Sequence, residues 1–153
     1  LARSTGCKEG NCENGYGKWV YTDKTTYEGE WVGTKKHGQG TETWPNGYIY
    51  KGEFKDSVWS GLGTLSFPDG STYEGQWVGT KKHGQGTETW PNGYIYKGEF
   101  KNSVWSGLGI LSFPDGSTYE GEWANGFMNG EGTFTWSDGK QKKGIWKNGK
   151  LQE

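Results

Sequence analysis

A 23-residue repeat constrains this chain more than any other feature of its sequence. Residues 31–76 and 77–122 align without gaps and differ at three positions, and each 46-residue copy divides into two weaker copies of 23 residues. In every copy a tyrosine, a glycine and a second ring recur two residues apart. The tyrosines are Tyr27, Tyr50, Tyr73, Tyr96 and Tyr119, and the second rings are Trp31, Phe54, Trp77, Phe100 and Trp123. A fixed period of this length is typical of repeat proteins whose units stack on their neighbours.

The spacing within each copy predicts β-strands. In the segment 50–54, Tyr-Lys-Gly-Glu-Phe, the rings and the glycine share one face and the charges the other, which is the period of a half-buried strand. The copies close with Asn-Gly or Asp-Gly, which supply the positive φ of a turn. We predict an all-β fold, an elongated single-layer twisted antiparallel meander of about twelve short strands. Its rings lie over the hollows that the glycines leave.

Composition agrees with a thin sheet and excludes several classes of protein. Hydrophobic residues make up 29% of the 153 residues and aromatic residues alone 16%, with 29 glycines. Ten tryptophans argue against intrinsic disorder. The 17 basic residues balance 18 acidic ones, for a net charge of −1. The chain therefore lacks the excess of basic residues that is typical of nucleic-acid-binding proteins. No apolar run approaches the length of a membrane-spanning helix, and no signal peptide is visible in a sequence that begins at Leu1.

The copy between Tyr27 and Tyr50 carries a known motif. It reads Tyr-Glu-Gly-Glu-Trp, five further residues, His-Gly-Gln-Gly, and then Pro-Asn-Gly before the next tyrosine. This pattern resembles the MORN repeat (membrane occupation and recognition nexus), and the resemblance covers about residues 15–146. It implies a single-layer array with one hairpin per repeat. It also implies roles in protein–protein interaction, in dimerisation and, in some members, in contact with acidic phospholipids.

The N-terminal segment reads as a degenerate extra repeat. A shift of 23 residues places Gly6 on Gly29 and Gly10 on Gly33. Terminal repeats lack one neighbour and often need a cap. We therefore expect residues 1–14 to form a capping repeat and residues 15–153 to form the array, with a final partial copy at Lys142.

Two cysteines lie in this N-terminal segment. Cys7 and Cys12 span one hairpin loop in the alignment, so we predict a disulfide, or at least two neighbouring thiols. A zinc site would need four ligands and a redox site more typically uses Cys-x-x-Cys, so both are weaker alternatives. An oxidised pair implies an exported protein. The cysteine-containing start resembles that of exported bacterial MORN proteins, which implies the bacterial periplasm or cell surface. A reduced pair implies a cytoplasmic or membrane-peripheral protein.

Residues with catalytic potential repeat along the chain and do not converge. His37 and His83 occupy one repeat position, which we expect at a loop. Glu28 and its equivalents fall opposite the aromatic face, without the single pair of carboxylates that a glycosidase uses. No glycine-rich phosphate loop precedes a helix. We therefore predict a protein that is not an enzyme, with no catalytic residue, cofactor or metal and no nucleic acid or small-molecule substrate as partner.

The ten rings named above are the first candidate binding surface. A single layer cannot cover its own second face, so we expect part of this stripe to stay exposed as a groove for a peptide, a glycan or a second copy.

A row of loop tips is the second candidate. The expected loop-rim binding residues are Lys35, Lys36, Trp59, Lys81, Lys82 and Trp105. Lysine beside tryptophan suits a membrane interface or a protein contact. In the alternative, Trp59 folds back onto the sheet and is buried, and the lysines serve only solubility.

These features favour a non-catalytic scaffold that mediates protein–protein interaction, self-association included. The first alternative is peripheral binding to acidic phospholipid through the loop rim. The second is glycan binding on the aromatic face.

Overall fold

The computed structural model describes residues 5–152 of the chain. All regular structure in this range is β-strand, and none of it is helical. The strands are β1 (Gly6–Gly10), β2 (Gly15–Val20), β3 (Thr26–Val32), β4 (Lys35–Thr43), β5 (Ile49–Lys55), β6 (Val58–Ser66), β7 (Thr72–Val78), β8 (Lys81–Thr89), β9 (Ile95–Lys101), β10 (Val104–Ser112), β11 (Thr118–Ala124), β12 (Phe127–Thr135), β13 (Gln141–Lys147) and β14 (Lys150–Gln152). The predicted all-β meander is confirmed, with two strands more than expected.

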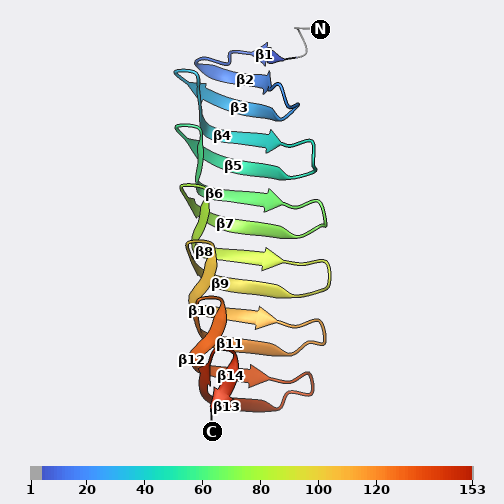
Figure 1. Ribbon diagram of the computed structural model, residues 1–153, viewed down its shortest axis with the longest axis vertical. Coiled ribbons are helices and arrows are strands. Elements are labelled where there is room, and N and C mark those ends of the chain that lie inside the picture. Colours follow the sequence, from blue (N-terminus) through green and yellow to red (C-terminus); the bar gives the residue numbers. More distant parts are fainter. Residues whose placement is uncertain (1–4, 153) are drawn as a thin grey trace. The chain divides into compact units, whose positions relative to one another are not determined.

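The chain divides into two compact units. One comprises Leu1–Gly70 and Gln76–Thr80, and the other Ser71–Gly75 and Lys81–Glu153, so β7 contributes residues to both. Within each unit the strands follow one another in chain order, and each pairs antiparallel with its neighbours (Figure 1). Each unit is therefore a single layer, as the repeat pattern predicts.

Two kinds of turn alternate along each unit. The Trp-Pro-Asn-Gly turns lie where expected, and in the first of them Gly47 takes a φ of 98° and donates its N–H to the carbonyl of Trp44 at 3.0 Å. On the opposite side the strands are joined by two residues that both take positive φ, which is the geometry of a type I′ hairpin. These tight turns are Gly33-Thr34, Asp56-Ser57, Gly79-Thr80, Asn102-Ser103, Asn125-Gly126 and Asn148-Gly149.

The tight turns correct the predicted loop tips. Lys35 and Lys36 begin β4, and Val58 and Trp59 begin β6, so none of them is a loop residue. His37, also expected at a loop, lies within β4 with its side chain exposed. The reason is geometric, because a type I′ turn needs only two residues and the next residue already pairs across the hairpin.

A β-bulge held by a glutamate recurs in the hairpins. The register between β3 and β4 shifts after Gly29, and Gly38 takes a φ of 62°. There the Glu30 carboxylate accepts a hydrogen bond from the backbone N–H of Gln39 at 2.6 Å. Equivalent bonds join Glu53 to Leu62, Glu99 to Leu108 and Glu122 to Glu131. These acids therefore satisfy backbone donors that the bulge leaves out of the ladder, a role that sequence reasoning missed.

The core of each unit is built from tyrosine rings lying over glycine. A Cβ added to Gly63 would collide with the ring of Tyr50. The Tyr50 hydroxyl donates a hydrogen bond to the carbonyl of Glu53 at 2.9 Å. Edge-to-face contacts continue the packing, with Tyr50 5.2 Å from Phe54 and 5.7 Å from Trp77 between ring centroids. Because glycine has no side chain, a buried ring fits against the backbone of a sheet one layer thick.

The N-terminal hairpin matches the repeat in a different alignment from the one predicted. Gly10 pairs with Gly17 across β1 and β2, as Gly29 pairs with Gly40 across β3 and β4. Gly10 therefore takes the place of Gly29, and the expected match of Gly6 with Gly29 is wrong. The connection between the paired glycines is shorter here than in the other hairpins, and this shifts β1 along the sequence. The boundary proposed at residue 14 falls in the loop that joins β1 to β2.

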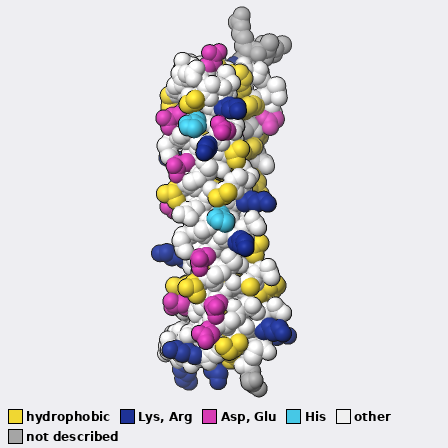
Figure 2. All heavy atoms as spheres, turned by 90° about the vertical axis from the view of Figure 1, so that its left-hand side faces the viewer, with side chains coloured by type: hydrophobic (Ala, Val, Ile, Leu, Met, Phe, Trp, Pro, Cys, Tyr) yellow, Lys and Arg dark blue, Asp and Glu magenta, His cyan; other side chains and the backbone are white. Residues whose placement is uncertain are grey.

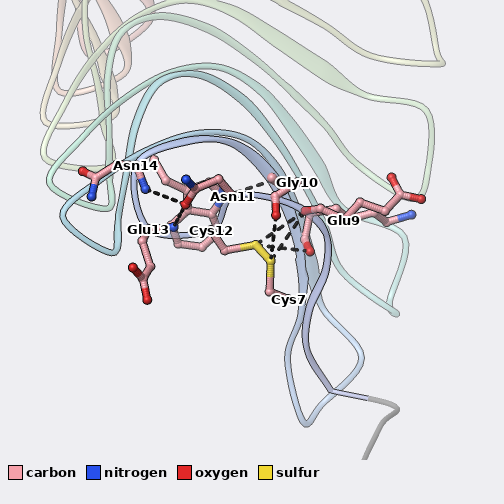
Figure 3. Close-up of a disulfide and its surroundings, with 10 residues drawn as sticks. Cys7, Glu9, Gly10, Asn11, Cys12, Glu13 and Asn14 are labelled. Carbon is pink, nitrogen blue, oxygen red and sulfur yellow. Dashed lines mark hydrogen bonds between the residues drawn. A yellow bond between two sulfur atoms is a disulfide. The ribbon is translucent and has the colours of Figure 1, made fainter.

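The disulfide predicted between Cys7 and Cys12 is present, with Cα atoms 6.0 Å apart (Figure 3). Cys12 is buried, and a Cβ added to Gly17 would lie only 2.8 Å from its Sγ. The disulfide thus covers the glycine of the N-terminal hairpin, as a tyrosine ring covers the glycine in the repeats that follow.

Candidate binding surfaces

The ten rings of the aromatic stripe are core residues. The five tyrosines have no exposed surface, and Trp31, Phe54, Trp77, Phe100 and Trp123 are at most 5% exposed. Burial raises the pKa of Tyr27, Tyr50, Tyr96 and Tyr119 above the ordinary value, and nearby glutamates add to the shift. These rings hold the strands together, and their direct contact with a partner stays a prediction.

Trp59 and Trp105 fold back onto the sheet. Trp59 is half-buried and stacks on Tyr50, with ring centroids 4.4 Å apart and planes 3° from parallel. Trp105 stacks on Tyr96 in the same way at 4.5 Å. This is the placement expected if these tryptophans cover the sheet.

Two of the four rim lysines also turn inward. Lys36 Nζ pairs with Glu42 Oε2 at 2.6 Å, and Glu42 Oε1 accepts a hydrogen bond from the Trp59 indole N–H at 2.7 Å. The ammonium also lies over the ring of Tyr27, 5.5 Å from its centroid. The same cluster recurs as Lys82, Glu88 and Trp105. Glu42 is only 6% exposed, so one buried carboxylate satisfies a cation and an indole from neighbouring hairpins.

Replacing Glu42 by leucine is expected to destabilise the fold by about 3 kcal/mol, because it leaves the Lys36 ammonium and the Trp59 N–H without their acceptor. Glu42→Gln keeps an acceptor for the indole, so its cost is smaller. Urea unfolding measures both. Glu28→Leu, on the half-exposed outer face of the same hairpin, is the control. An equal loss for Glu42→Leu and Glu28→Leu would refute the role of the cluster.

The outward side chains beside the tight turns form a surface that we call the tip edge. Each tight turn is flanked by a cross-strand pair, and the pairs Val32–Lys35, Lys55–Val58 and Lys101–Val104 each join a valine to a lysine. All six residues are exposed. Figure 2 views the side of the tight turns and shows hydrophobic side chains among lysines and acids.

The outer face next to the tip edge carries further apolar residues. Leu62 in the first unit is 60% exposed, and Leu108 in the second is 64% exposed. Tyr16, on β2, is 62% exposed. Leu62 and Leu108 are equivalent positions of the two 46-residue copies, so the same exposed apolar side chain recurs in each unit. Among the described residues, no helix is long and apolar enough to span a membrane.

The fold and these surfaces define a repeat protein of single-layer β-hairpins with a buried aromatic core and an apolar, basic edge. The MORN repeat model matches residues 27–47, 50–72, 73–93, 96–118 and 119–141, well over half of the chain, which therefore belongs to the MORN repeat family. MORN repeats are in general interaction modules for proteins or membranes, and the repeat itself is not an enzymatic unit.

Two individual proteins are similar to parts of the chain. Alsin of Rattus norvegicus is 42% identical over 36 residues, which is 24% of this chain and 2% of Alsin, so the match covers a small part of that protein. In solved structures, the SAS-4 (dCPAP) TCP domain of Drosophila melanogaster, in complex with a proline-rich motif of Ana2 (dSTIL), superimposes with a TM-score of 0.55. That alignment has 15% identity and covers 86% of this chain and 72% of the TCP chain, a likeness of fold.

Proposed function

We propose that this chain is a non-catalytic scaffold that binds another protein through its tip edge, with a second copy of the chain as one such partner. The observation that carries the proposal is the exposed valine–lysine pairing at two tight turns of the first unit and one of the second, while the aromatic rings are used as core. Valine supplies apolar area and lysine a charge that selects acidic partners. The similarly folded TCP domain is in complex with a proline-rich motif, which supports a peptide-binding use of such a sheet.

Charge reversal at the tip edge tests the proposal. The triple variant Lys35→Glu, Lys55→Glu, Lys101→Glu is expected to reduce partner recovery in a quantitative pull-down at least about tenfold, because like charges across an interface are costly. The control reverses Lys51, Lys97 and Lys143, which are exposed but lie away from the tight turns. Sedimentation of the wild type tests self-association. The proposal fails if the wild type is an inert monomer or if both triple variants recover the partner equally.

Binding to acidic phospholipid is the second candidate, and the exposed lysines Lys35, Lys55, Lys81 and Lys101 favour it. Each contributes on the order of 1 kcal/mol near an anionic bilayer. Flotation with vesicles containing anionic lipid separates this function from the first one. If the wild type floats with the vesicles and the tip-edge variant floats equally well, phospholipid binding through these lysines is excluded. The glycan alternative needs exposed ring faces, and the burial of the ten rings gives it no support.

A further inference from the structure

The Cys7–Cys12 disulfide ties an exposed strand to a well-anchored loop. Among the described strands, β1 pairs with β2 alone, and none of its five residues is buried. By contrast, β3 and β5 each place two buried rings in the core of the same unit. A strand that buries so little apolar surface opens at a low free-energy cost. Beyond its backbone pairing with β2, β1 is therefore held to the unit by the disulfide.

The loop that carries Cys12 is held from its other side. The carbonyl of Glu13 and the Oδ1 atom of Asn14 accept the backbone N–H groups of the tight turn Gly33-Thr34, each at 2.9 Å. Within the loop, Asn11 Oδ1 accepts the N–H groups of Glu13 at 3.0 Å and of Asn14 at 2.9 Å (Figure 3). None of these bonds involves β1. The loop can therefore keep its place on the tight turn when β1 moves away.

The two sulfur atoms differ in their exposure. Cys7 is an exposed residue, whereas Cys12 is only 7% exposed. Exposed disulfides are more readily reduced than buried ones, so an incoming thiolate meets Cys7 first. The carbonyl oxygen of Glu9 lies 3.5 Å from Cys7 Sγ, and that of Lys18 lies 3.5 Å from Cys12 Sγ. Both thiols of the reduced protein therefore have a hydrogen-bond acceptor within reach, the buried one included.

We propose that this disulfide is a redox latch, which a dithiol reductant opens and which then releases β1. A thiolate of the reductant bonds to Cys7 Sγ and the S–S bond breaks, so Cys12 leaves as a thiolate and takes up a proton. The second thiol of the reductant then displaces Cys7 from the mixed disulfide. The products are two protein thiols and a reductant oxidised to its own disulfide.

Release of β1 uncovers the edge of β2. The backbone N–H and C=O groups that paired with β1 then lack partners, and such an edge accepts another strand. The opened loop keeps Cys12 beside Gly17, so the latch can close again when the thiols are oxidised. This edge is separate from the tip edge, and the inference goes beyond the proposed function.

Amide hydrogen exchange of the oxidised protein and of the protein reduced with dithiothreitol tests the latch. We expect the amides of β1, and those of β2 that pair with them, to exchange at least about tenfold faster after reduction, because the loop is no longer closed. The amides of β4 and β5 should keep their rates. Cys7→Ser should behave like the reduced wild type and should not respond to dithiothreitol, which controls for other effects of the reagent.

Alkylation of the reduced protein with iodoacetamide tests the different anchoring of the two cysteines. We expect Cys7 to react at least about tenfold faster than Cys12, because Cys7 leaves with β1 while Cys12 stays in its loop. The rates in urea-unfolded protein give the intrinsic reactivities for comparison. Asn11→Ala removes two bonds of the loop, so it should bring the two folded-state rates together.

Unchanged exchange of the β1 amides after reduction would overturn the inference, because β1 would then stay on the sheet without the link. Loss of protection throughout β1 to β5 would overturn it too, since the disulfide would then support the whole unit. So would a disulfide that dithiothreitol reduces only in urea-unfolded protein. Equal alkylation of Cys7 and Cys12 in the folded wild type would contradict the anchored loop. None of these results depends on partner recovery through the tip edge.

Discussion

Gly52→Ala is expected to destabilise the protein by about 3 kcal/mol, because the added methyl group overpacks a closely paired part of the sheet. Gly52 faces Gly63 across β5 and β6, and its added Cβ would collide with the Cα of Gly63 and lie 2.6 Å from the carbonyl oxygen of Leu62. Both obstacles are backbone, so no side-chain rotation relieves them. The Tyr50 hydroxyl, 2.9 Å from the same Cβ, is buried and cannot withdraw. Urea unfolding followed by circular dichroism measures the loss.

Gly33→Ala separates this steric effect from backbone strain. Gly33 lies in a tight turn with a φ of 57°, and nothing lies within 4 Å of its added Cβ. The substitution is expected to lower the free energy of unfolding by about 1 kcal/mol, because alanine disfavours the left-handed backbone conformation. Equal losses for the two substitutions would show that glycine serves the backbone conformation alone and that the rings do not need its hollow.

Stability is expected to fall steeply above about pH 10, the ordinary pKa of tyrosine. Burial raises the pKa of Tyr27, Tyr50, Tyr96 and Tyr119 in the folded state. The folded state therefore holds protons that the unfolded state has lost at alkaline pH. The stabilisation is complete below the unfolded pKa and is lost as the pH rises above it. Each tyrosine lowers the free energy of unfolding by up to about 1.4 kcal/mol per pH unit in this range. The four together therefore approach a slope of about 5 kcal/mol per pH unit.

Urea unfolding between about pH 8 and about pH 11 tests this dependence. Tyr50→Phe removes one buried phenol, so it should make the alkaline slope shallower, and it should cost about 1 kcal/mol at neutral pH through the lost hydrogen bond to Glu53. Tyr16→Phe, at an exposed position, should leave the slope unchanged. A flat profile up to about pH 11 would mean that water reaches the phenols in the folded state.

The fold followed from the sequence because its strongest signals are local. The Tyr50-x-Gly52-x-Phe54 alternation has the two-residue period of a β-strand, and the Pro-Asn-Gly sequences indicate where the hairpins end. The tight turns were misplaced by about two residues, because the loop tips were set by alignment of the repeats, although Asn125-Gly126 carries the Asn-Gly signal that marks such turns.

The Lys36–Glu42–Trp59 cluster was beyond sequence reasoning for a different reason. Its members come from two neighbouring repeats, and one repeat position holds lysine in one copy and tryptophan in the next. When one repeat is considered alone, Lys36 looks like an exposed charge at the loop rim. The pairing emerges only when two repeats are packed together and the buried carboxylate needs both donors.

The N-terminal alignment failed because it assumed a constant period. The shorter connection of β1 and β2 puts Gly10 opposite Gly17 and brings Cys7 to a tyrosine position. A uniform shift of 23 residues cannot represent a deletion. The cysteine pair was still predicted because any hairpin across that segment brings the two residues within disulfide reach.

The central claim is that tyrosine rings lying on glycine are the core, which leaves the tip edge for partners. Photochemically induced nuclear polarisation, which enhances only the tyrosine and tryptophan signals that a dye in solution can reach, tests it most directly. We predict enhancement at Tyr16, Tyr94 and Trp136 and none at Tyr27, Tyr50, Tyr73, Tyr96 and Tyr119. Enhancement at any of those five tyrosines in the folded protein would contradict the account.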